Sequence, residues 1–249
     1  MKLFLLNILR SVLFDLKSSS SRSFFNIYWI TIGFSLFVFV KSFIFSEVLN
    51  QIFTNYTLFL SSSLAIWYFL SGITTGGCSI YTGNKIQLMM QIPKNYFLIY
   101  LYCRKSIEFF LQLLVYLFFS VLTLEFNIIG FLLFLLNLII LMLVLYPFVM
   151  NLAYLSLLSK DFSIFIGYLI KVFFFITPVI WGTNMISEKY NLFLLLNPYY
   201  HFLEILRNPL LDNVNSFIHY KYLLIFFIIN FSLFLYLSKK IPNHELYIA

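Results

Sequence analysis

Long apolar stretches separated by short polar connections recur along the chain. Most of them reach the roughly 20 residues that an α-helix needs to cross the hydrocarbon layer of a membrane. They cover residues 24–45, 57–81, 96–124, 128–158, 162–181 and 222–238. The pattern predicts an all-α membrane protein with six transmembrane helices.

Residues 3–18 show a different pattern, in which apolar and polar side chains recur with the period of a helix. The apolar face consists of Leu5, Ile8, Leu9, Val12, Leu13 and Leu16. We expect an amphipathic helix that lies in the membrane interface. A signal peptide is disfavoured, because Arg10 and Asp15 interrupt the apolar run and no cleavage site of small residues follows.

The composition supports the membrane assignment. The chain has 249 residues, of which 62% are hydrophobic and only 10% charged, and its mean hydropathy is +0.94. Soluble domains have about 25% charged residues. Since no linker or low-complexity run is present, we expect residues 1–249 to form a single membrane domain. The net charge of +7 is scattered between apolar runs, which excludes a nucleic-acid-binding stripe.

The distribution of Lys and Arg predicts the orientation. With the N-terminus inside, six crossings leave eleven basic residues on the cytoplasmic side and three outside. The inner set is Lys2, Arg10, Lys17, Arg22, Lys85, Lys94, Arg104, Lys105, Lys160, Lys239 and Lys240, and the outer set is Lys189, Arg207 and Lys221. Cytoplasmic segments carry such an excess, so both termini are expected in the cytoplasm.

The second apolar stretch contains Gly72, Gly76 and Gly77, a spacing that lets another helix approach closely. The same residues do not form a phosphate-binding loop, because Cys78 stands where such a loop needs lysine. The chain therefore cannot bind ATP in that way. In the fourth stretch, Pro147 is expected to kink the helix.

The connection at residues 83–94 is short, cytoplasmic and amphipathic. Its candidate contact residues are Lys85, Ile86, Met89, Met90 and Pro93. The segment fits a docking knob for a partner's groove, or equally a loop that rests on lipid headgroups.

Arg104 and Glu108 follow this connection and stand one helical turn apart. We expect them to form an ion pair at the cytoplasmic edge of the third crossing.

Residues 184–211, between the fifth and sixth crossings, are too apolar for a free loop and too interrupted to span a membrane. A re-entrant or interfacial segment at the outer surface is expected. Asn197 and Pro198 have the spacing of a helix start, and Glu204 and Arg207 can pair. His201 and Glu204 share a face and could form half of a metal site or an acid/base pair, but no second such set accompanies them.

Lys171 falls near the middle of the fifth crossing, where burial of its charge in lipid costs about 2.5 to 3.5 kcal/mol. We expect it to face protein or water. It could line a conduit for an anionic or hydroxylated substrate, or pair with Asn137 or Asn151. A neighbouring stripe on the same helix, suited to contact with sugar rings, lipid or core, consists of Phe165, Tyr168, Val172 and Phe175.

Four segments together resemble a known family. They are ILRSVLFDLKSSSSRSFFNIYW at 8–29, IYTGNKIQLMMQIPKNYFLIYLYCRKSIEFF at 80–110, LSKDFSIFIGYLIKVFFFITPVIW at 158–181 and LNPYYHFLEILRNPLL at 196–211. In this order they resemble the permease subunit of type-2 ABC exporters of lipid-linked polysaccharide, which include O-antigen, capsule and teichoic acid exporters. Lys160 stands where that family more often has Arg, and the serine run at 18–21 departs from its pattern.

The resemblance implies a function and partners. It implies a homodimer in the bacterial inner membrane that encloses a channel for lipid-linked polysaccharide, with lipid around it. A separate ATP-binding subunit would hold ATP and magnesium, so this chain would carry no cofactor. Residues 83–94 would couple to that subunit, and residues 184–211 would gate the outer mouth.

Two alternatives remain for the function. One is a permease for another lipid or a drug on the same scaffold. The other is a polytopic glycosyl or acyl transferase, which usually needs a convergent set of carboxylates, His or metal ligands. The loops offer only isolated candidates, so we do not expect an enzyme.

Overall fold

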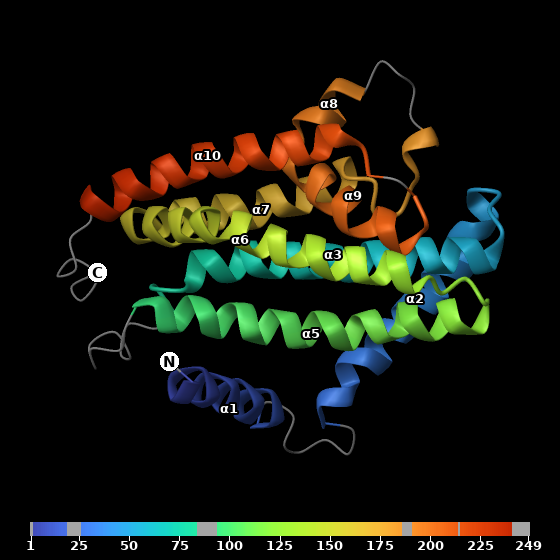
Figure 1. The fold of residues 1–249 in the computed structure, drawn as a ribbon, viewed down its shortest axis with the longest axis horizontal. Helices are drawn as coiled ribbons and strands as arrows, with labels where there is room; N and C mark the ends of the chain where they lie inside the picture. Colours follow the sequence, from blue (N-terminus) through green and yellow to red (C-terminus); the bar gives the residue numbers. More distant parts are fainter. Residues whose placement is uncertain (1, 19–25, 84–93, 186–190, 214, 241–249) are drawn as a thin grey trace.

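The computed structural model describes residues 2–18, 26–83, 94–185, 191–213 and 215–240, which are almost entirely helical and contain no strand (Figure 1). The helices are α1 (Lys2–Ser18), η1 (Asn26–Tyr28), α2 (Trp29–Val48), α3 (Phe53–Ser79), α5 (Lys94–Leu122), α6 (Ile128–Leu158), α7 (Lys160–Ile176), η2 (Thr183–Met185), α8 (Asn191–Leu196), α9 (Pro198–Leu210) and α10 (Phe217–Lys240).

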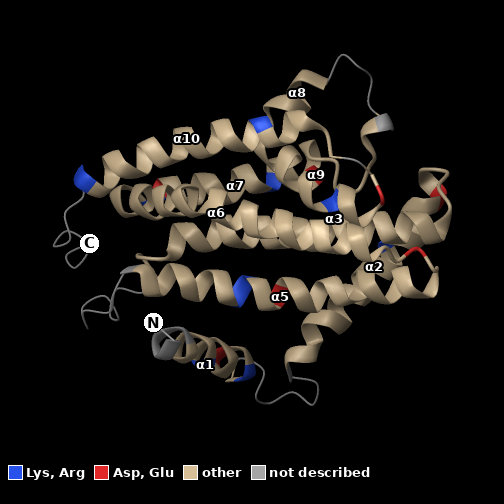
Figure 2. Cartoon of the chain, viewed as in Figure 1, with Lys and Arg blue, Asp and Glu red and all other residues tan. Residues whose placement is uncertain are grey.

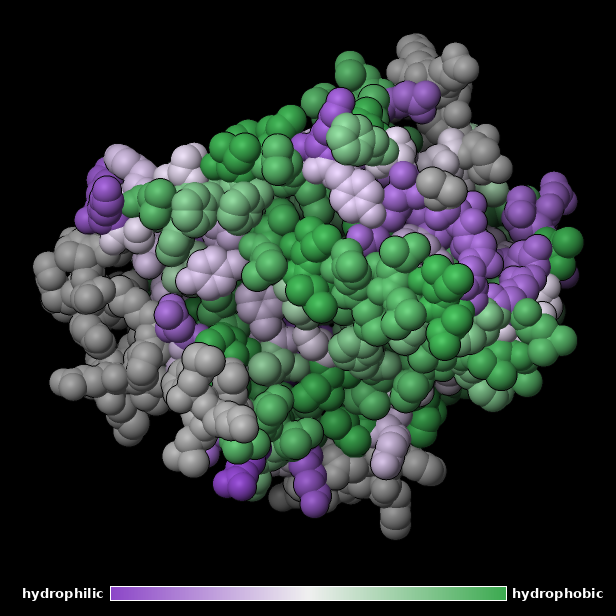
Figure 3. Space-filling model, in the orientation of Figure 1, coloured by the Kyte–Doolittle hydropathy of each residue, from purple (hydrophilic) through white to green (hydrophobic). Residues whose placement is uncertain are grey.

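Five of these helices are long and apolar enough to cross a membrane: α2, α3, α5, α6 and α10. Most of the surface in Figure 3 is hydrophobic, and Figure 2 shows few charged residues along the helices. Soluble proteins do not expose apolar patches of this extent, whereas lipid covers them without cost. The expectation of an all-α membrane protein is confirmed at this level.

The fifth expected crossing, 162–181, is shorter in the structure. Helix α7 ends at Ile176, and Thr177 already has an extended backbone. The cause is Pro178, because a residue that precedes proline is disfavoured in the helical region. The remaining helix has 17 residues, at the lower limit for a membrane crossing.

Helix α3 lies at the centre of the bundle. It packs against α2, α5, α6, α7 and α9, and most of its side chains are buried, whereas α10 is largely exposed. The glycines permit this packing: a methyl group at Gly76 would come within 2.5 Å of Leu101 in α5, and one at Gly77 within 3.0 Å of Val149 in α6. Their spacing therefore serves close helix approach, as the sequence predicts.

Helix α1 packs on the outside of α5. Its buried side chains, Ile8, Val12 and Leu16, form a small apolar cluster with residues that include Ile99 and Cys103 of α5. On the polar side of α1, the Asp15 carboxylate accepts a hydrogen bond from the Tyr100 hydroxyl of α5. Part of the expected apolar face is therefore turned toward the bundle, whereas Leu9 and Leu13 of the same face are exposed.

Side-chain caps define where helices begin. Asn127 accepts hydrogen bonds from the backbone amides of Ile129 and Gly130 at the start of α6, at 2.9 and 3.3 Å. Ser159 accepts one from Asp161 at the start of α7, at 3.2 Å. These caps satisfy amides that have no partner within the helix. Helix α6 continues through Pro147 to Leu158.

Helix α9 lies between α7 and α10 in the sequence, and in space it is part of the bundle. It packs against α3, α6 and α10, and nearly all its side chains are buried. Gly130 allows the end of α9 to approach, because a methyl group there would clash with the carbonyl of Pro209.

Candidate functional site

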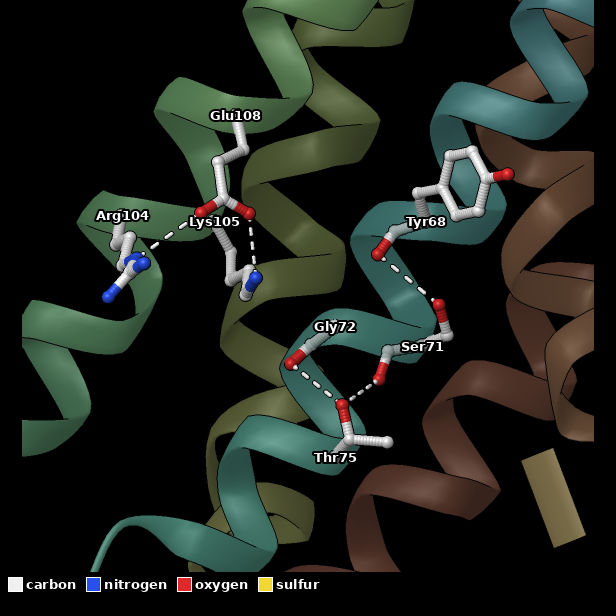
Figure 4. A network of polar contacts seen from close by, with 7 residues as sticks. All are labelled: Tyr68, Ser71, Gly72, Thr75, Arg104, Lys105 and Glu108. Atoms are coloured by element: carbon white, nitrogen blue, oxygen red, sulfur yellow. Dashed lines mark hydrogen bonds and ion pairs between the residues drawn. The ribbon is translucent and has the colours of Figure 1, made fainter. Parts of the chain in front are cut away.

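The second half of α3 leaves a strip of small and polar residues uncovered. The strip consists of Tyr68, Ser71, Gly72, Thr75, Gly76 and Ser79. Their spacing of three and four residues places them on one helical face. The hydroxyl groups donate to carbonyls of their own helix, for example Thr75 to Ser71 at 2.8 Å (Figure 4). Ser79 likewise donates to Gly76 at 2.9 Å. Their oxygens can still accept hydrogen bonds from a ligand.

Three charged residues of α5 lie beside this strip. Glu108 accepts from Nε of Arg104 at 3.2 Å and from Nζ of Lys105 at 2.6 Å (Figure 4). The side chains are 38%, 25% and 22% exposed for Arg104, Lys105 and Glu108. The pair expected between Arg104 and Glu108 is present, and Lys105 is a second partner. One carboxylate faces two cations, so the trio has a net positive charge.

Gly72 brings the strip and the trio together. A methyl group at residue 72 would lie 3.1 Å from Cδ of Lys105, so the lysine side chain passes directly over this glycine. A larger residue at position 72 would separate Lys105 from α3.

Two cavities flank the charged trio. The first has a volume of about 570 Å³ and lies between α1, α3 and α5. Its polar lining includes Ser11, Asp15, Ser79, Tyr100, Arg104 and Lys105. The second, of about 470 Å³, lies between α2, α3 and α5, and Tyr68, Glu108 and Gln112 are its polar lining. We call the strip, the trio and both cavities the α3–α5 track.

The expected channel residues lie elsewhere. Phe165, Tyr168, Lys171 and Phe175 are all exposed on one face of α7. Nζ of Lys171 lies 4.9 Å from the centre of the Tyr168 ring, within range of a cation–π contact.

The alternative, that Lys171 pairs with Asn137 or Asn151, is wrong. Asn137 donates to the carbonyl of Ile205 at 3.0 Å and accepts from Tyr220 at 3.1 Å. Asn151 donates to the carbonyl of Asn230 at 2.9 Å. Both amides join neighbouring helices, because a buried amide is satisfied best by a partner on the facing helix.

The expected gate residues gather in and before α9. Asn197 accepts a hydrogen bond from the amide of Tyr199 at 3.0 Å, and Pro198 is the first residue of the helix, as predicted. The side-chain amide of Asn197 also donates to Thr177 at 2.8 Å. The start of α9 is thereby fixed to the end of α7.

Arg207 is the buried cation of this region. It pairs with Glu204, and it donates to Ser63 at 3.0 Å and to the carbonyl of Pro178 at 2.7 Å. Its guanidinium lies 4.5 Å from the centre of the Phe59 ring. Arg207 thus connects α9 to α3 and to the break after α7. Burial lowers the pKa of Arg207, and Glu204 opposes that shift.

His201 contacts His219 and the end of α8 in the structure. Its Nδ1 lies 2.9 Å from Nδ1 of His219, and its Nε2 lies 2.9 Å from the carbonyl of Leu195. Burial lowers the pKa of His201 below its ordinary value of 6.5. The described part of the chain holds no group of three His, Cys, Asp or Glu residues that could bind a metal ion.

The five candidate coupling residues, Lys85, Ile86, Met89, Met90 and Pro93, lie outside the described residues. The α3 strip was not predicted, although hydroxyl residues and glycines recur there at helical spacing. Lys105 was not predicted to pair either, although its partner Glu108 stands three residues further on in the same helix. The partnership of Tyr100 with Asp15 becomes evident only from packing.

Fold and site together define an all-helical membrane protein with a polar track beside its central helix. No protein-family model matches the chain, and no curated protein matches it.

Proposed function

We propose that this chain is the transmembrane subunit of an ATP-driven exporter that moves lipid-linked polysaccharide, such as O-antigen or a capsule-like glycan, across the bacterial inner membrane. The observation that carries the proposal is the α3–α5 track. Hydroxyl groups of α3 and three charges of α5 on the side of α1 lie on helices long enough to cross a membrane. Polar groups on such helices usually face protein or a water-filled path instead of lipid, and here they would receive the substrate at the cytoplasmic edge.

The chemistry of the track suits a hydroxylated, negatively charged substrate. The strip offers hydroxyl oxygens, and Arg104 and Lys105 offer donors of which Glu108 uses only a part. Lys105 covers Gly72 and Leu101 covers Gly76, so the substrate would meet the exposed hydroxyl groups of the strip, such as those of Thr75 and Ser79. A lipid carrier that ends in phosphate and sugar groups has this combination of charge and hydroxyls.

The direction of the helices supports six crossings. Helix α6 ends near the same end of the bundle as the end of α10, whereas α10 begins at the opposite end (Figure 1). The chain must return between them, and α7 provides about 25 Å of that path at 1.5 Å per residue. In this proposal α7 is the fifth of six crossings, both termini are cytoplasmic, and residues 184–211 form the outer gate.

A single chain leaves the face of α7 with Phe165, Tyr168, Lys171 and Phe175 exposed. In the proposed homodimer this face would line the channel together with its symmetry mate. Lys171 would then face water instead of lipid, which removes most of the cost of its charge.

The function is tested by deleting the gene that encodes this chain in its native cell, and by purifying a tagged copy of the chain. We expect glycan to accumulate inside and to disappear from the surface, and the tagged chain to copurify with an ATP-binding subunit. Deletion of residues 83–94 should abolish that copurification but leave membrane insertion intact. Normal surface glycan without the chain would refute an export role, and an intracellular loss of glycan would instead indicate a transferase.

A further inference from the structure

An apolar groove lies on the face of the bundle formed by α5, α6 and α10. Its volume is about 460 Å³, and its lining is Tyr102, Met142, Leu143, Tyr146, Phe227 and Phe231. Small-molecule sites have volumes of about 300 to 1,000 Å³. Helices α6 and α10 expose many large apolar side chains around it, and Figure 3 shows the broad hydrophobic surface of this side. A molecule in this groove therefore comes from the membrane.

The groove contains one polar group that the protein does not satisfy. The hydroxyl of Tyr102 is buried and has no hydrogen-bond partner among the described residues. A buried hydroxyl without a partner costs about 1 to 3 kcal/mol relative to a satisfied one. Tyr102 lines the groove but its oxygen is covered, so a molecule in the groove would reach this donor once a neighbouring side chain moved aside.

The position of Tyr102 along α5 indicates the depth of this donor in the membrane. Its sequence neighbours Ile99 and Cys103 pack against the apolar face of α1. An amphipathic helix of this kind lies at the boundary between headgroups and acyl chains. Tyr102 therefore lies near the interface, at the level where a glycerophospholipid carries its ester carbonyls.

The positions of the two phenol groups along the groove agree with this depth. Tyr146 is nearer than Met142 to the end of α6 that lies on the side of α1, and Phe231 is likewise nearer than Phe227 along α10. The two phenols, together with Phe231, thus lie toward the interface, and Met142 and Phe227 lie deeper. An acyl chain below its ester group has the same order.

We propose that this groove binds one acyl chain of a glycerophospholipid from the leaflet on the side of α1, and that its ester carbonyl accepts a hydrogen bond from Tyr102. Among the described residues, no charged side chain lines the groove, so the phosphate stays outside, in the headgroup layer. Met142 is unbranched and can change rotamer to admit the carbonyl. The proposal requires only that the protein spans a membrane, and it is independent of the exported substrate.

The test uses the full chain reconstituted in phosphatidylcholine bilayers. These contain a trace of diester phosphatidylcholine with a photoactivatable diazirine midway along one acyl chain. After irradiation and digestion, mass spectrometry should find the label at residues 142–146 and 227–231. Tyr102→Phe keeps the shape of the groove but removes the donor, so labelling should fall about five-fold. Leu143→Trp should fill the groove and abolish labelling.

Two controls keep the result interpretable. Tyr236→Phe removes an exposed phenol of α10 outside the groove, and its labelling should equal that of the unmodified chain. Each variant must remain monodisperse with an unchanged unfolding temperature. Labelling of Ile225 and Ile228, which are exposed outside the groove, to the same extent as the groove would overturn the proposal. Equal labelling by a diether probe, which lacks the carbonyl, would overturn it as well.

Discussion

The side chain of Lys105 passes over Gly72, with its Cδ 3.1 Å from where a methyl group at that glycine would lie. A leucine at position 72 would displace Lys105 and fill the exposed strip of α3. Helices α3 and α5 are already joined at Gly76 and Leu101, so we expect Gly72→Leu to fold but to lower export of glycan at least ten-fold. Surface glycan, measured against the amount of inserted protein, checks this.

Gly167 provides a control for stability alone, because it lies one turn before Lys171 on the face proposed to line the channel. It lies in α7 with nothing within 4 Å of an added methyl group, so Gly167→Leu adds the same volume away from the α3–α5 track. Its unfolding temperature should equal that of the unmodified chain. Full export by Gly72→Leu would contradict a role of the strip in transport.

Hydropathy predicted the long helices of the fold but did not predict where backbone geometry ends a helix. Lipid imposes apolar stretches of defined length, so the helices at 57–81, 96–124 and 128–158 are within a few residues of α3, α5 and α6. The shortened α7 was not predicted, because hydropathy continues through Thr177 and Pro178 while the backbone does not. Hydropathy measures solvent preference, and backbone geometry is a separate constraint.

The candidate site was predictable only where partners are close in sequence. Glu108 and Arg104 stand one turn apart, and helical spacing alone pairs them. The partnership of Arg207 with Ser63 spans most of the chain, and the contact of Lys105 with Gly72 depends on how α5 packs against α3. Such relationships arise from tertiary packing, which a single sequence does not specify.

The Lys105 and Glu108 pair should behave as a coupled unit. Glu108→Gln leaves Arg104 and Lys105 without a counter-charge, and we expect it to destabilise the protein by about 1 kcal/mol. Adding Lys105→Met should restore part of that loss, because it removes one of the unpaired cations. Thermal unfolding in detergent of both single variants and the double variant gives the coupling energy.

Arg104→Met serves as the comparison for this cycle, since Arg104 is more exposed than Lys105 and its bond to Glu108 is longer. The coupling energy of Arg104→Met with Glu108→Gln should be smaller than that of Lys105→Met with Glu108→Gln. Strict additivity of Lys105→Met and Glu108→Gln would show that the pair contributes nothing.

Removal of Arg207 should destabilise the protein far more. Arg207→Met leaves the Glu204 carboxylate buried without its cation, and a broken buried pair costs about 3 to 5 kcal/mol. Glu204→Gln in the same chain should recover a large part of this, since a neutral amide is cheaper to bury. The unfolding temperatures of the single and double variants measure both effects. If Arg207→Met and the double variant were equally stable, the loss would come from the Ser63 and Pro178 contacts alone.

Lys171 should matter for export more than for folding. Its side chain is exposed and its contact within the chain is with the Tyr168 ring. Lys171→Leu should therefore leave the unfolding temperature within about 2 °C, because exposed substitutions change stability by less than about 0.5 kcal/mol. Surface glycan should fall several-fold if this face lines the channel. Unchanged glycan, with Lys171→Arg as the charge-conserving control, would exclude that role.

Acid should weaken the protein through His201. Its pKa is lowered from 6.5, chiefly by burial and also by the neighbouring His219, while the Leu195 carbonyl and Glu204 act in the opposite sense. The unfolded chain therefore takes up a proton near pH 6.5 that the folded chain does not. The stabilisation is complete above pH 6.5 and is lost as the pH falls through the lowered pKa of the folded state.

The expected slope is at most about 1.4 kcal/mol per pH unit, the value for one extra proton bound by the unfolded state. His201→Gln can still bond to His219 and to the Leu195 carbonyl but has no proton to gain, so its unfolding temperature should fall less between pH 6.5 and lower pH. The variant keeps the groups that surround the His201 ring, which are Glu204, Arg207, Tyr222 and His219. The difference between the two pH profiles therefore isolates His201, and superimposable profiles would show that its protonation does not limit stability.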